Sequence, residues 1–169
     1  MILKKTLDKY YKITHTCAKV KNMNDSEKKL DKQVMTLLDE DQKVLFLKTL
    51  LFASKIDGKV DDQEIRFIKK MAQKYKVQDA KKVFENITKE NLLTSLSGNL
   101  PRRGALELVK ELFLMGHVDT DFCVEEILFV SDVGKALGLN QEKLEQISHW
   151  VIDYLILKEQ GTIIFEENN

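Results

Sequence analysis

Residues 57–64 read DGKVDDQE, and this acidic stretch lies between two segments with contrasting apolar patterns. Before it, Val44–Ile56 is hydrophobic almost without interruption, which is typical of a helix buried on most sides. After it, apolar side chains recur at the spacing of one helical face, at Ile65, Ile68, Met71, Ala72 and Tyr75. The stretch therefore predicts a helix–acidic loop–helix unit.

The unit occurs a second time. A shift of 62 residues lays Lys43–Val77 over Ala105–Leu139 without a gap, and apolar positions coincide along both helices. The identical pairs are Lys48 and Lys110, Leu50 and Leu112, Asp57 and Asp119, Glu64 and Glu126, Ile65 and Ile127, and Phe67 and Phe129. Two such helix pairs related by an approximate twofold would share one core.

The composition favours an all-α fold. The chain has 169 residues with one proline and seven glycines, so few residues interrupt long helices. We predict one compact helical bundle of about seven to eight helices over residues 1–169, with repeat units near 43–77 and 105–139. Thr88 and Asn140 are expected to cap helices, and so is Asp79. Gly161 is expected to end the last helix, which leaves 161–169 as a tail, extended over its apolar part.

The acidic residues have a structural explanation. Asp61 and Glu64 have the spacing of a capping box, in which each side chain accepts a backbone N–H at the start of a helix. Gly58 supplies the positive φ that a tight turn before the helix requires. On this interpretation the acids cap helices, and each cap contributes about 1 kcal/mol.

The alternative is a divalent cation site in each loop. Carboxylate oxygens favour calcium or magnesium over zinc, and the candidate ligands are Asp57, Asp61, Glu64, Asp119, Asp121 and Glu126. The site would not be an EF-hand. Counted from Asp57, the position of the turn glycine holds Asp62 and that of the bidentate glutamate holds Ile68.

The stretch 57–65, between an apolar and an amphipathic helix, resembles the repeat signature of the tellurite-resistance TerB-like family. The same module forms the N-terminal domain of some membrane-anchored DnaJ-type co-chaperones. The resemblance covers residues 42–154. It implies an all-helical, pseudo-symmetric, stress-related module whose acidic loop residues bind divalent metal, here Asp57 with Glu64 and Asp119 with Glu126. The second copy departs from the pattern, because Thr120 replaces the glycine and Cys123 takes the place of a cap.

No motif predicts an enzyme. The sequence has no glycine-rich phosphate loop, no zinc-protease motif and no nucleophile elbow. His117, Asp119 and Cys123 supply three possible zinc ligands, whereas zinc usually has four. Three would suffice only for a catalytic site with an open position. We therefore expect a non-enzymatic module that contacts other, unidentified proteins. The alternatives are a structural adaptor without metal, a co-chaperone-associated module, and an enzyme whose site the sequence does not reveal.

Charge argues against nucleic acid as a partner, since 27 basic residues balance 27 acidic ones. Residues 1–21 nevertheless hold six lysines against the single Asp8. Such a basic amphipathic helix can lie on a membrane surface, although packing of its apolar face on the bundle is the favoured interpretation. The first residues lack the apolar core of a signal peptide, and two cysteines are too few for a disulfide framework, so a cytoplasmic location is expected.

Overall fold

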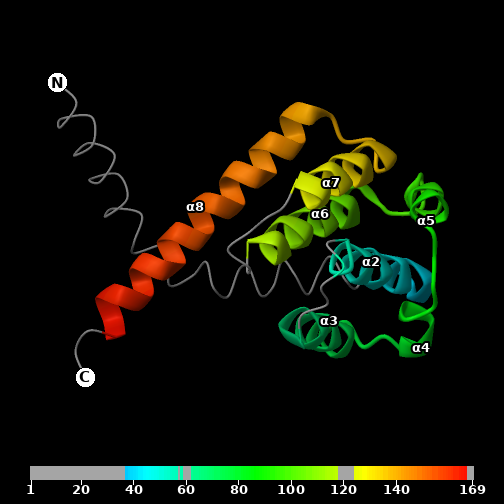
Figure 1. The fold of residues 1–169 in the computed structure, drawn as a ribbon, viewed down its shortest axis with the longest axis horizontal. Coiled ribbons are helices and arrows are strands. Elements are labelled where there is room, and N and C mark those ends of the chain that lie inside the picture. The colour runs from blue at the N-terminus through cyan, green and yellow to red at the C-terminus, as the bar shows by residue number, and fades with distance from the viewer. Residues whose placement is uncertain (1–36, 57, 59–61, 118–123, 167–169) are drawn as a thin grey trace. The chain divides into compact units, whose positions relative to one another are not determined.

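The computed structural model describes residues 37–56, 58, 62–117 and 124–166, all of which belong to one compact unit. The described residues form seven helices and contain no strand, which confirms the predicted all-α class (Figure 1). The helices are α2 (Glu40–Ala53), α3 (Asp62–Lys74), α4 (Ala80–Val83), α5 (Lys89–Leu96), α6 (Arg102–Gly116), α7 (Val124–Ala136) and α8 (Gln141–Glu166). That residues 1–169 form a single domain stays a prediction.

Helices α2 and α6 are the centre of this unit. Helix α2 packs against α3, α4, α5 and α6, while α6 also packs against α7 and α8. Their inward residues are fully buried, with Phe46, Leu47 and Leu50 on α2 and Leu108, Val109 and Leu112 on α6. Burial of each such side chain contributes about 1.5–3 kcal/mol. The near-continuous apolar segment thus forms the central helix that the sequence predicted.

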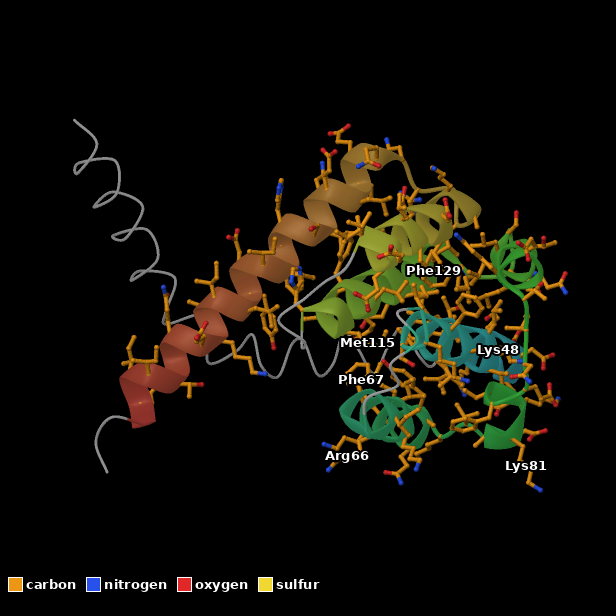
Figure 2. The ribbon with its side chains drawn as sticks, viewed as in Figure 1. Lys48, Arg66, Phe67, Lys81, Met115 and Phe129 are labelled. Carbon is orange, nitrogen blue, oxygen red and sulfur yellow. The ribbon has the colours of Figure 1, made fainter. Side chains whose placement is uncertain are left out.

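Aromatic side chains connect the two helix pairs. The rings of Phe52 on α2 and Phe129 on α7 are stacked, with centroids 5.2 Å apart. Phe129 is buried, whereas Phe67, its counterpart in the shifted sequence, is only partly buried (Figure 2). Identical residues of the two copies therefore have different surroundings.

Two of the three predicted caps are confirmed. Thr88 accepts a hydrogen bond at Oγ1 from the Asn91 N–H (3.3 Å), and Asn140 accepts one at Oδ1 from the Lys143 N–H (3.1 Å). Asp79 precedes α4 but makes no side-chain cap. Its carboxylate instead lies 3.9 Å from Lys82 Nζ.

The predicted end of the last helix was wrong. Helix α8 continues through Gly161 to Glu166, so residues 161–166 are not an extended tail. The backbone of Gly161 does not have the positive φ that a glycine cap adopts. A glycine inside a helix costs only about 1 kcal/mol relative to alanine, and the apolar residues that follow continue the helix.

Candidate metal centre at the helix joints

The first acidic loop joins α2 to α3. Helix α2 ends in a tight turn at Ser54, whose backbone N–H donates to the Leu50 carbonyl and whose buried Oγ donates to the Leu51 carbonyl (2.9 Å). Gly58 follows with φ +74°, a left-handed conformation that favours glycine. The positive φ predicted for this glycine is therefore confirmed.

Helix α3 begins at Asp62, so Asp61 is the residue directly before the first helical position. That is where a cap residue belongs, and Glu64 then lies in the first helical turn. Asp57 and Asp61 are outside the described residues, and for Glu64 only the backbone is described. The helix boundary agrees with the predicted capping box, while the hydrogen bonds of that box stay a prediction.

The second acidic loop joins α6 to α7. His117 is the C-cap of α6 and donates its backbone N–H to the Phe113 carbonyl (3.1 Å). Helix α7 begins at Val124 and has Glu125 and Glu126 in its first turn; Glu125 is exposed and Glu126 partly buried. Asp119, Asp121 and Cys123 are outside the described residues.

The two joints occupy equivalent positions along the chain. The 62-residue shift carries α3 onto α7 residue for residue, and α2 onto all of α6 except its last residue. The C-terminal caps also coincide. Val77 donates its N–H to the Ala72 carbonyl (3.1 Å), as Leu139 does to that of Gly134 (2.8 Å). The preceding residues, Lys76 and Gly138, both have positive φ. These common features support the repeat, whose twofold symmetry stays a prediction.

Cation ligation at the joints is not visible in the described part of the chain. Within it, no three His, Cys, Asp or Glu side chains gather as metal ligands do. Four of the six candidate ligands, Asp57, Asp61, Asp119 and Asp121, lie outside that part. The cation site therefore stays a prediction.

A pocket of about 380 Å³ borders the first joint, between α2 and the segment after α4. Lys55 and Ile56 line it next to the acidic loop. Its lining also includes Lys48, whose Nζ lies 3.6 Å from the Glu85 carboxylate. With two lysines and one paired carboxylate in its lining, the pocket is a poor cation site.

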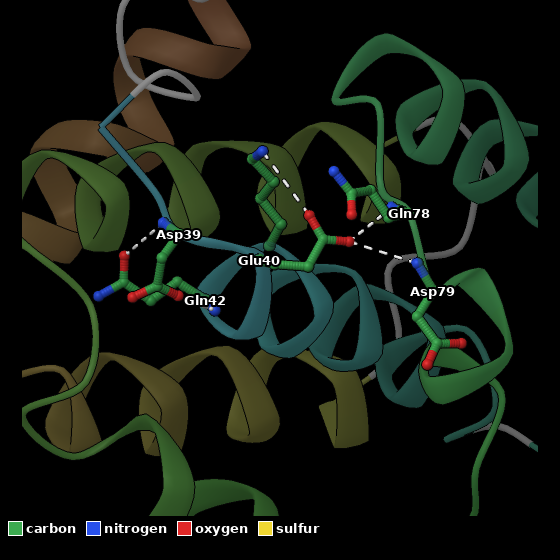
Figure 3. A network of polar contacts seen from close by, with 6 residues as sticks. Asp39, Glu40, Gln42, Gln78 and Asp79 are labelled. Atoms are coloured by element: carbon green, nitrogen blue, oxygen red, sulfur yellow. Dashed lines mark hydrogen bonds and ion pairs between the residues drawn. The ribbon is translucent and has the colours of Figure 1, made fainter.

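A polar network at the start of α2 was missed by sequence reasoning. Glu40 Oε1 accepts hydrogen bonds from the backbone N–H groups of Gln78 (2.5 Å) and Asp79 (3.4 Å) (Figure 3). Asp39 and Gln42 form a capping box, and Gln42 Nε2 donates to the Asn99 carbonyl (2.8 Å). The network thus connects the start of α2 to the loops before α4 and α6. Aspartate followed three residues later by glutamine is a signal that could have revealed the capping box.

These features define an all-helical module built from two helix pairs with matching boundaries. The chain belongs to the TerB family: the family model for the tellurite resistance protein TerB matches residues 53–149, more than half of the sequence. The match includes both acidic loops. No curated protein and no solved structure matched significantly. None of the helices described has the length and apolarity needed to cross a membrane.

Proposed function

We propose that this TerB-family chain is a non-enzymatic, stress-related module that contacts other proteins and binds a divalent cation at its acidic loops. One observation carries the proposal. Each loop joins the two helices of one pair, at the same position in both pairs, and the helix boundaries of the two pairs match. Each loop also leads into a helix with an acidic first turn. Family membership supports it, because the resemblance in the loops implies metal binding.

The chemistry of the loops favours a hard cation. The candidate ligands are all carboxylates, and oxygen ligands select calcium or magnesium over zinc. The first loop is the better candidate because it has Gly58 and the Asp61–Glu64 pair, whereas the second has Thr120 and Cys123 at the corresponding points. A helix N-terminus repels cations, so carboxylates from the loop must offset the macrodipole.

A calorimetric titration tests the cation site. Wild-type chain is titrated with calcium, magnesium, manganese and zinc, and so is the double variant Asp57→Asn plus Asp119→Asn. We expect heat of binding for calcium or magnesium with wild type, and a loss of at least tenfold in affinity with the double variant. Asp153→Asn, at an exposed position of α8 outside both loops, is the matched control and retains wild-type affinity.

Two results would contradict the cation site. One is no binding of any of the four cations by wild type, and the other is equal binding by wild type and the double variant. In either case the acids act as helix caps, and the module is a structural adaptor without metal.

Protein contact is tested separately. Wild-type chain and the double variant are immobilised and exposed to an extract of the cells that naturally produce this protein. The extract contains either calcium and magnesium or a chelator. We expect specific partners that both require the cation and are lost with the double variant. If the same partners are retained under all conditions, protein binding does not depend on the acidic loops.

A further inference from the structure

The second half of α8 exposes a long apolar surface. The last core residue of this helix is Val151, and beyond it Leu157, Ile163, Ile164 and Phe165 are all more than half exposed. A helix of 26 residues is about 39 Å long, whereas α6, against which it packs, is about 23 Å long. Monomeric proteins rarely leave contiguous apolar patches of more than a few hundred Å² uncovered.

Part of this surface has the spacing of a helix–helix seam. Six residues recur at alternating intervals of three and four positions, about a quarter turn from the buried Leu144 and Val151. We name them the α8 seam: Ile147, Trp150, Tyr154, Leu157, Gly161 and Ile164. The seam extends over about 27 Å of helix, and all but Ile147 lie beyond the residues of the family match.

The seam has its two largest side chains, Trp150 and Tyr154, in its first half and its one small residue, Gly161, near its C-terminal end. The rings of Trp150 and Tyr154 are stacked, with centroids 5.5 Å apart and an interplanar angle of 8°, and form a flat aromatic surface. Gly161 has open space where a side chain would project, since a Cβ added there meets no atom of the described residues within 4 Å, the neighbouring backbone of α8 aside. The seam therefore has a projection near one end and a notch near the other.

This order of sizes is self-complementary. If a second α8 seam runs antiparallel and crosses between residues 155 and 156, Trp150 of each copy lies opposite Gly161 of the other. Tyr154 then lies opposite Leu157, and Ile147 opposite Ile164. A parallel pair would instead place tryptophan on tryptophan and leave a void between two glycines, which close packing disfavours. A twofold interface requires this kind of self-complementarity.

We propose that the α8 seam pairs two copies of this chain in an antiparallel, twofold-symmetric dimer. Trp150 of each protomer packs into the notch at Gly161 of its partner. A large aromatic side chain that fills a pocket on the partner is typical of energetically dominant contacts in interfaces. The α8 seam shares no residue with the acidic loops, so the proposal does not depend on cation binding.

Sedimentation equilibrium of the full chain over a wide concentration range tests the proposal. We expect wild type to sediment at twice the mass of one chain at micromolar concentrations. Gly161→Trp fills the notch and should weaken dimerisation at least a hundredfold. Because no side chain of the described residues lies within 4 Å of that Cβ position, the variant should keep its fold, which circular dichroism checks. Gln160→Trp adds the same side chain one position away, outside the seam, and should remain dimeric.

The paired variant Trp150→Ala plus Gly161→Trp gives the sharpest outcome. It exchanges the projection and the notch, so it should recover dimerisation that both single variants lose. A wild-type chain that stays monomeric at all concentrations overturns the proposal, because residues 1–36 or a different partner then cover the seam. A dimer that Gly161→Trp does not weaken, or that the paired variant fails to recover, also overturns it.

Discussion

At the scale of single residues, Asp132 shows how charge connects separate helices. Its carboxylate on α7 lies 2.8 Å from Lys89 Nζ on α5 and 3.7 Å from Lys135 Nζ. The hydrogen bond from Lys89 is the main reason why the pKa of Asp132 lies below its ordinary value. A carboxylate whose pKa is lowered by folding stabilises the protein above its ordinary pKa and loses that contribution as pH falls.

Asp132→Asn should therefore lower the free energy of unfolding at pH 7 by about 0.5 kcal/mol, since a partly exposed ion pair contributes little. The difference from wild type should shrink as the pH falls below about 4, where the wild-type carboxylate becomes protonated. Urea unfolding of both proteins at pH 7, 5, 4 and 3 measures this difference in the free energy of unfolding. Asp153→Asn controls for the loss of one carboxylate, and a difference that grows towards pH 3 would contradict the assignment.

Single caps were the most predictable residues, because their hydrogen bonds are local. Thr88 and Asn140 needed only the residues directly after them. Glu40 could not be predicted in the same way, since its partners Gln78 and Asp79 are nearly forty residues away in the sequence. Its role depends on how the helices pack, which a local pattern does not contain.

At the scale of elements, Gly138 and Gly161 show two different roles of glycine in helices. Gly138 follows α7 with φ +68° and serves as a cap, whereas Gly161 lies inside α8 without positive φ. Residue type alone predicts a helix end at both positions. The difference arises because the residues after Gly161 continue the helix, while Leu139 after Gly138 turns back to bond with α7.

Gly161→Ala should raise the free energy of unfolding by about 0.5–1 kcal/mol, because alanine is the better residue within a helix. Gly138→Ala should lower it by about 1 kcal/mol or more, because alanine is strained at positive φ. Thermal unfolding at a low chain concentration, at which the dimer dissociates, compares the two variants. If both substitutions destabilise the protein equally, Gly161 ends the helix after all.

At the scale of the whole molecule, the 62-residue shift of the sequence relates two helix pairs whose boundaries match in the structure. Both predicted helix pairs exist with matching boundaries, and the paired positions Phe46 and Leu108, Leu47 and Val109, and Leu50 and Leu112 are all buried. The packing of α6 between α7, α8 and α2 could not be predicted, because amphipathic patterns show which face is buried but not which helix covers it.

Binding of a divalent cation at the acidic loops is the central claim for the molecule as a whole. Ligands that bind only the folded state raise its stability by mass action, whereas capping acids stabilise it with or without metal. Asp61→Ala and Glu64→Ala should therefore each lower the melting temperature in a chelator, because each removes half of a capping box. This loss alone does not distinguish a pure cap from a cap that also binds a cation.

The melting temperature of wild type, measured with a chelator and with calcium or magnesium at about a hundred times the dissociation constant, tests the claim most directly. Saturation to that degree raises the free energy of unfolding by about 2.7 kcal/mol. This corresponds to a rise in melting temperature of roughly 5–10 °C for a chain of this size. We predict that rise for wild type and its loss in Asp57→Asn plus Asp119→Asn. An unchanged wild-type melting temperature at millimolar calcium and magnesium would contradict the account.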